Sequence, residues 1–102
     1  MKWPLDPKDV TTRRITGSTL VCEGPCLLVS LVAAPITTSG YVTVHDGLDA
    51  NAEGKVTLDV TKGTSLMYDP AVPPKLDQGL YVAFTTYAGY LTVQFHKLQQ
   101  GE

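Results

Sequence analysis

A chain of 102 residues is long enough for one domain with a modest core, because a chain of this length buries roughly two-thirds of its unfolded surface on folding. Hydrophobic residues make up 43% of the chain and charged residues only 18%, so few charges cover the surface and we expect partners to cover part of it. The formal net charge is −2 and the basic residues are scattered, which argues against nucleic-acid and membrane partners, since both need a basic cluster.

The N-terminal segment, residues 1–12, is expected to be an extended arm. Pro4 and Pro7 interrupt any helix there, and Trp3 is its only strong apolar anchor. A tryptophan on an arm packs against its own domain or against a neighbouring subunit, and the sequence favours neither. The start of the chain lacks the apolar region of a secretory signal, so we expect synthesis in the cytoplasm.

From Arg13 onward, short β-rich segments alternate with turn residues, and no segment has the apolar spacing of an amphipathic helix. This pattern predicts an all-β domain over residues 13–98, a small antiparallel β-sandwich or barrel, followed by a polar tail at residues 99–102. The proline-rich connection at residues 69–75 is expected to cross from one sheet to the other. About seven strands are predicted, at residues 14–22, 26–34, 40–46, 55–61, 64–68, 79–86 and 90–98.

The predicted strand at residues 26–34 is apolar on both faces, which predicts a central position or cover on both sides. Its apolar run is interrupted by Ser30 and is much shorter than the ~20 residues of a membrane-spanning helix. Cys22 and Cys26 flank the turn before this strand. A disulfide between them is geometrically feasible, but free thiols are expected in a protein made in the cytosol. Two thiols without further ligands do not make a zinc site.

His45 and Asp46 are candidates for a catalytic pair, but a turn explains them better. Neighbours in a strand point to opposite faces, and Asp before Gly47 is typical of a turn. The loop at residues 46–54 places oxygen ligands as the first half of a calcium loop does, but Val60 stands where a bidentate Glu is required. We therefore expect a non-enzymatic protein without a cofactor or metal.

The last two predicted strands are expected to form a hairpin with a two-residue turn at Ala88-Gly89, which pairs Tyr87 with Tyr90 and Phe84 with Val93. One face of this hairpin then belongs to the core, and the opposite face is rich in Tyr and Thr. Tyrosine suits protein interfaces and sugar stacking, although Tyr and Thr are also simply good strand residues. With the arm, this face supplies the candidate interaction residues Trp3, Tyr81, Tyr87, Tyr90, Thr92, Gln94 and His96.

Several strand-and-turn segments carry a family resemblance: Gly40-Tyr41-Val42-Thr43-Val44-His45-Asp46-Gly47, Ala52-Glu53-Gly54-Lys55-Val56, Gly79-Leu80-Tyr81-Val82 and Leu91-Thr92-Val93-Gln94-Phe95. In these segments the chain resembles small β-sandwich proteins encoded among the virion structural genes of tailed bacteriophages. The resemblance covers residues 13 to 98 and includes no catalytic signature.

The resemblance implies a virion protein made in the host cytoplasm. Such a protein is a capsid decoration (cement) protein that contacts the major capsid protein, or a component of the tail or of its connection to the head. The resemblance also implies a homo-oligomer, often a trimer, held by β-sheet contacts and extended arms. From another functional class, a carbohydrate-binding module that uses surface tyrosines remains an alternative.

Overall fold

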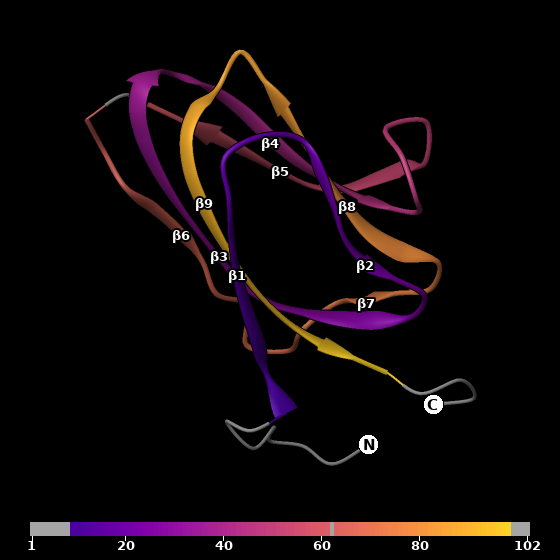
Figure 1. Cartoon of the computed structure of the whole chain (residues 1–102). Helices are drawn as coiled ribbons and strands as arrows, with labels where there is room; N and C mark the ends of the chain where they lie inside the picture. The colour runs from indigo at the N-terminus through magenta and orange to yellow at the C-terminus, as the bar shows by residue number, and fades with distance from the viewer. Residues whose placement is uncertain (1–8, 62, 99–102) are drawn as a thin grey trace.

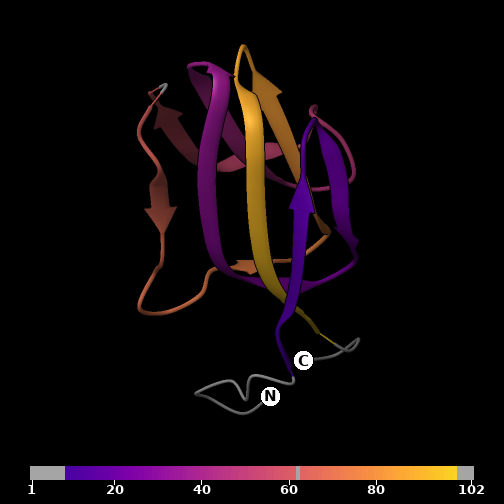
Figure 2. The ribbon, with the colours of Figure 1, turned by 60° about the vertical axis from the view of Figure 1, so that its left-hand side comes forward.

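The chain folds into two antiparallel sheets that pack against each other as a β-sandwich (Figures 1 and 2). This computed structural model describes residues 9–61 and 63–98, and side chains there except those of residues 35–37. The described residues contain no helix that is long and apolar enough to span a membrane. Their nine strands are β1 (Thr11–Ile15), β2 (Thr19–Glu23), β3 (Cys26–Thr38), β4 (Gly40–Asp46), β5 (Glu53–Val60), β6 (Leu66–Tyr68), β7 (Lys75–Leu76), β8 (Gly79–Thr85) and β9 (Ala88–Lys97).

Each sheet contributes one apolar face to a common core. Sheet A has the strand order β1-β9-β3-β6, with β7 pairing to β3 as well, and sheet B has the order β2-β8-β4-β5. Successive residues of a strand point to opposite faces, so every second residue reaches the core. In β4, Val42 and Val44 are completely buried, and in β9 the same is true of Leu91 and Val93. The strand predicted to be apolar on both faces, β3, is central in sheet A.

The expected arm and the first predicted strand both need correction. β1 begins at Thr11, inside the expected arm, while residues 1–8 lie outside the described residues. The single strand predicted at residues 14–22 is two strands, because the chain leaves sheet A after Ile15 and enters sheet B at Thr19. β1 and β2 are therefore the edge strands of sheet A and sheet B on the same side of the sandwich. The guanidinium of Arg13 links these edges by donating to the carbonyls of Leu20 (3.3 Å) and Val21 (3.5 Å).

The predicted hairpin of the last two strands is wrong. β8 pairs with β2 and β4 in sheet B, whereas β9 pairs with β1 and β3 in sheet A. Thr86, at the crossing, has a positive φ of 65°, and Ala88 and Gly89, predicted as the turn, belong to β9. The apolar faces of the two strands therefore meet across the core, which buries more surface than a flat hairpin.

The proline-rich connection at residues 69–75 does not cross between the sheets. It joins β6 to β7, and both strands pair with β3 in sheet A. The carbonyl of Pro74 accepts a hydrogen bond from the backbone N–H of Leu28 (3.0 Å), which holds the connection to that sheet. The crossing comes later, at Asp77-Gln78, between β7 and β8.

Candidate functional site

The residues of the expected interaction face lie in three separate places. Tyr81 belongs to sheet B, where its ring is 6.2 Å from that of His45 between centroids. Tyr87 is buried at the crossing between the sheets, with 5% of its surface exposed. Trp3 lies outside the described residues. The structure brings together the other four on the outer face of sheet A, because they alternate with the core residues of β9: Tyr90, Thr92, Gln94 and His96.

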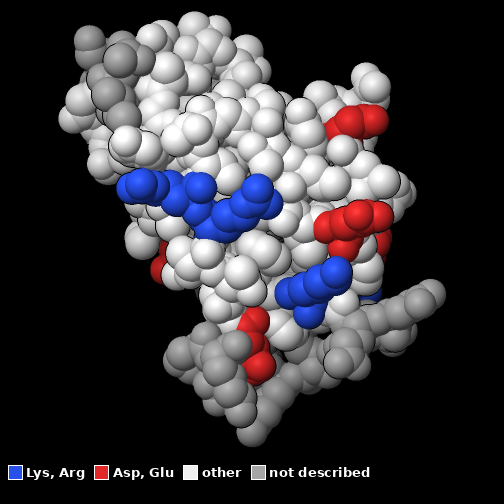
Figure 3. Space-filling model, in the orientation of Figure 1, with Lys and Arg blue, Asp and Glu red and all other residues white. Residues whose placement is uncertain are grey.

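The outer face of sheet A carries little charge. Its four residues from β9 share this face with residues of four other strands: Thr12 and Arg14 of β1, Leu27, Ser30, Val32 and Ala34 of β3, Met67 of β6 and Lys75 of β7. Arg14 and Lys75 are the only Lys, Arg, Asp or Glu among these twelve residues, and Met67 is 64% exposed. Figure 3 shows the charged side chains on the side of the molecule seen in Figure 1, with wide uncharged areas between them.

Side-chain contacts hold this face in one arrangement. The Ser30 hydroxyl donates to the side-chain oxygen of Gln94 (2.7 Å), and the Gln94 amide donates to the hydroxyl of Thr12 (3.3 Å). These bonds join β3, β9 and β1 across the sheet. At one end, the Arg14 guanidinium carbon lies 4.3 Å from the centroid of the Tyr90 ring, a cation–π contact. A face with fixed side chains loses less entropy when it binds a partner.

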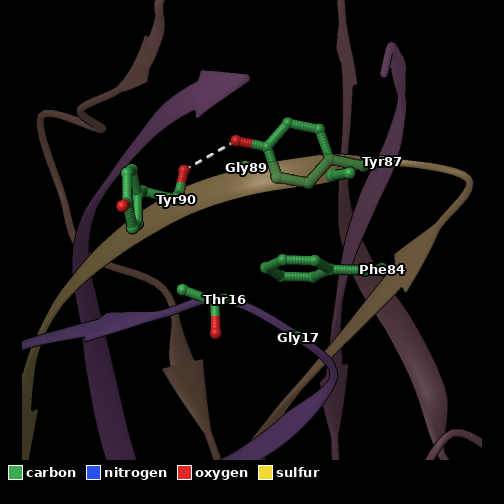
Figure 4. Close-up of a pocket in the computed structure, with 7 residues that line it drawn as sticks. Thr16, Gly17, Phe84, Tyr87, Gly89 and Tyr90 are labelled. Atoms are coloured by element: carbon green, nitrogen blue, oxygen red, sulfur yellow. Dashed lines mark hydrogen bonds between the residues drawn. The ribbon is translucent and has the colours of Figure 1, made fainter. Parts of the chain in front are cut away.

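A pocket of about 360 Å³ opens beside Tyr90, at the end of the sandwich where the chain crosses between sheets (Figure 4). One side comes from the β1–β2 connection and the other from β8 and the start of β9. Its volume is near the lower limit of small-molecule sites, roughly 300–1,000 Å³, and is suited to one large side chain or a small ligand. Its walls include Thr16, Gly17, Phe84, Tyr87, Gly89 and Tyr90.

The aromatic walls of the pocket are rigid. The rings of Phe84 and Tyr87 pack edge to face, with centroids 5.0 Å apart, and Figure 4 shows Phe84 beneath Tyr87. The Tyr87 hydroxyl donates to the backbone carbonyl of Tyr90 at 2.6 Å. Burial raises the pKa of Tyr87, so its hydroxyl stays protonated as a donor. Tyr87 therefore supports the pocket wall, and its hydroxyl is already bonded within the chain.

One side of the pocket is open because Gly17 has no side chain. No atom lies within 4 Å of the position that a Cβ would take at Gly17, and its φ is outside the left-handed region. The neighbouring Ser18 hydroxyl accepts a hydrogen bond from the backbone N–H of Phe84 (2.9 Å), which fixes the β1–β2 connection against β8. The opening therefore lies between two anchored segments.

His45, Asp46, His96 and Asp49 all bond to backbone atoms. Nδ1 of His45 lies 2.9 Å from the Ala52 carbonyl, while the Asp46 carboxylate accepts from the Gln78 N–H (2.8 Å). Nδ1 of His96 lies 2.7 Å from the carbonyl of Asp9. In the calcium-like loop, the Asp49 carboxylate accepts from the Asn51 N–H in a local turn. The described part of the chain contains no group of three or more His, Cys, Asp or Glu positioned to hold a metal ion.

Both cysteines are buried free thiols. They lie on either side of the turn that carries the chain from β2 of sheet B to β3 of sheet A. Burial raises the pKa of Cys26 well above its ordinary value, and the neighbouring Cys22 thiol, which hydrogen-bonds to it, raises it further. The raised pKa makes Cys26 a weak nucleophile. Both side chains are buried in the core and pack there as small apolar residues do.

The pocket and three of the residues around it do not follow from the sequence pattern. The predicted hairpin has Phe84 on its core face, and the strand predicted at residues 14–22 includes Thr16 and Gly17. The only signal for this site is Gly17, which interrupts the strand pattern, since an isolated Gly in a strand marks a break or a close approach.

Comparison of the chain with protein-family models, curated proteins and solved structures gave no match.

Proposed function

We propose that this chain is a non-enzymatic structural subunit of a phage virion, a capsid decoration (cement) protein that forms homo-oligomers and contacts the major capsid protein. The observation that carries the proposal is the outer face of sheet A, which presents Tyr90 and Met67 on a fixed sheet with Arg14 and Lys75 as the only charged residues among the twelve named above. The core of a protein interface has few charged residues overall and is enriched in aromatic residues, Met and Arg. This face has the same composition. The resemblance of the strand segments to virion proteins of tailed phages suggests that the partner surface belongs to a virus particle.

The experiment separates capsid from tail. The purified protein is mixed with capsids and with tails that lack it, and each mixture is sedimented and assayed for bound protein. We expect binding to capsids at a fixed stoichiometry, and an oligomer in sedimentation velocity of the free protein. Binding to tails alone would assign the chain to the tail or the head-tail connection. A protein that stays monomeric at high concentration and binds neither particle would refute the proposal.

A matched pair of variants assigns the binding to the outer face of sheet A. Met67→Lys places a charge on that face, whereas Val72→Lys makes the same kind of change at an apolar residue in the β6–β7 connection, which is 77% exposed. We expect Met67→Lys to weaken binding to the particle or self-association, because a lone charge is unfavourable in an interface core. Val72→Lys should bind as the unchanged protein does.

Carbohydrate binding is the second candidate, and the aromatic pocket is the observation that favours it. Tyr81 is in the other sheet and the Tyr87 hydroxyl is bonded internally, so a sugar would stack on Tyr90 or Phe84 at the pocket. A glycan array tests this function, with Tyr90→Ala as the variant. Binding that Tyr90→Ala abolishes would support the sugar site, and an array without binding would refute it.

A further inference from the structure

We propose that the pocket between the β1–β2 connection and the start of β9 binds the indole of Trp3 from a second copy of this chain. The contact is then head to tail, with the arm of one subunit in the pocket of the next. This inference rests on the homo-oligomer of the proposed function and names the contact that would build it.

The pocket has the chemistry that an indole needs. Its volume of about 360 Å³ accommodates one large aromatic side chain, and the Phe84 and Tyr87 rings already pack edge to face in its wall. Aromatic rings prefer such offset or edge contacts, and a buried indole also needs an acceptor for its N–H. Thr16 lines the pocket with its hydroxyl turned away from the aromatic rings (Figure 4), and a rotation of this side chain would offer the hydroxyl as that acceptor.

The surroundings of the pocket are those of an interface hot spot. Tyr90 forms one wall, and Arg14 lies over its ring 4.3 Å from the centroid. Trp, Tyr and Arg are the residues that contribute most to binding energy in protein interfaces, typically as an anchor seated in a well-packed pocket. The pocket also adjoins the outer face of sheet A through Tyr90, so an arm bound there would continue the surface of the proposed function.

Chain length argues that the bound Trp3 comes from another copy. The arm joins the described chain at Asp9, whose carbonyl lies 2.7 Å from Nδ1 of His96. β1 begins at that end of the sandwich and runs to the opposite end, where the pocket lies (Figure 2). The seven residue steps from Asp9 to Thr16 cover ~23 Å in an extended strand.

The arm is too short to return over that distance. Six residue steps separate Trp3 from Asp9, or ~20 Å when fully extended, and a reversal of direction uses two or more of them in a turn. The four steps that remain cover ~13 Å of the ~23 Å, and the length of an indole side chain does not make up the difference. A pocket on another copy can lie ahead of the arm, so the arm would reach it without a reversal. Pro4 and Pro7 restrict the arm before binding, which reduces the entropy lost on docking.

Trp3 is the only tryptophan in the chain, so its fluorescence reports the docking directly. The full-length protein is studied over a wide concentration range by fluorescence and by sedimentation velocity. We expect the tryptophan emission to move to shorter wavelength, with less quenching by acrylamide, over the same concentrations at which the protein associates. A contact between copies requires the two transitions to coincide.

Two variants separate the arm from the pocket. Gly17→Leu places a leucine side chain at the pocket from a Cβ position that has no atom within 4 Å, and Trp3→Ala removes the indole. We expect each to weaken self-association about 30-fold, the effect of removing a hot spot. Ser65→Leu is the control for an added leucine, because Ser65 is exposed and outside the pocket. Circular dichroism checks that each variant is folded.

Mixing the two variants gives the decisive measurement. The Gly17→Leu protein has an arm but a filled pocket, and the Trp3→Ala protein has an open pocket but no indole. Together they should form a complex in which the emission of Trp3 shifts to shorter wavelength, although neither shows the shift alone. A shift that is independent of concentration and unaffected by Gly17→Leu would show that Trp3 packs on its own chain, which overturns the inference.

The remaining outcomes separate this inference from the proposed function. An oligomer that persists in both variants while the Trp3 emission stays that of an exposed indole overturns the docking contact and leaves the virion role standing. A protein that is monomeric at every concentration, with exposed Trp3 and no binding to capsids or tails, overturns both.

Discussion

The Tyr87 hydroxyl donates a 2.6 Å hydrogen bond to the backbone carbonyl of Tyr90, across the point where the chain leaves sheet B and enters sheet A. This bond spans only three residues, yet it holds together the turn that separates β8 from β9. The ring of Tyr87 packs at the same time against Phe84. Tyr87 and Tyr90 therefore stabilise the crossing between the sheets and also form part of the pocket wall.

Tyr87→Phe is expected to keep the ring contact and remove the hydrogen bond. The free energy of unfolding should fall by about 1 kcal/mol, the usual net value of one such bond, or somewhat more because the Tyr90 carbonyl loses its donor. Urea denaturation measures this change. A variant as stable as the unchanged protein would mean that water replaces the hydroxyl at no cost.

Gly40→Ala should be severely destabilising. A Cβ at this position would overlap with the carbonyl oxygen of Thr85 and the amide nitrogen of Tyr87, and both are backbone atoms that cannot rotate away. We expect a loss of more than ~3 kcal/mol or failure to fold. Gly17→Ala is the matched control, because its Cβ enters open space, and denaturant unfolding should show little change. Equal stability of the two variants would contradict the packing described at Gly40.

The buried thiol of Cys26 makes stability depend on alkaline pH. Its pKa in the folded protein is raised above the ordinary value of 9.0, chiefly by burial, so the unfolded chain loses this proton first as the pH rises. Its contribution to stability is therefore complete below about pH 9 and decreases above it, with a limiting slope of about 1.4 kcal/mol per pH unit.

Urea denaturation at pH 8 and pH 10 checks this dependence, with Cys26→Ala as the control. The unchanged protein should lose more stability between the two pH values than Cys26→Ala does. Tyr87, whose pKa is also raised by burial, contributes to the slope in both proteins and drops out of the comparison. An identical loss in both proteins would show that the Cys26 thiol titrates normally in the folded state.

Arg14→Gln should have a small effect on stability. The change removes the cation over the Tyr90 ring but keeps a polar side chain of similar length at an exposed position of β1. Cation–π contacts at exposed sites contribute about 0.5–1 kcal/mol, so a loss within that range is expected in thermal or urea unfolding. Arg14→Lys should retain part of the contact, and a larger loss for Lys than for Gln would contradict this interpretation.

The sequence by itself determined the fold class and most of the strands. The strand predicted at residues 40–46 has these limits in the structure, because Val42 and Val44 alternate with polar residues between turn signals. The central position of β3 also followed from its apolar residues on both faces. Alternation and turn residues act over a few neighbours along the chain, and the sequence displays them directly.

Only the tertiary structure decided which strands pair. Phe84 and Val93 fit the pattern of a hairpin as well as that of two strands in opposite sheets, because both arrangements have the same two-residue period. Burial of both apolar faces against each other, together with the bend at Thr86, selects the crossing. The crossing places Tyr81 and Tyr90 in different sheets. It also forms the pocket at Gly17, because the segments that line the pocket meet only after the sheets have packed.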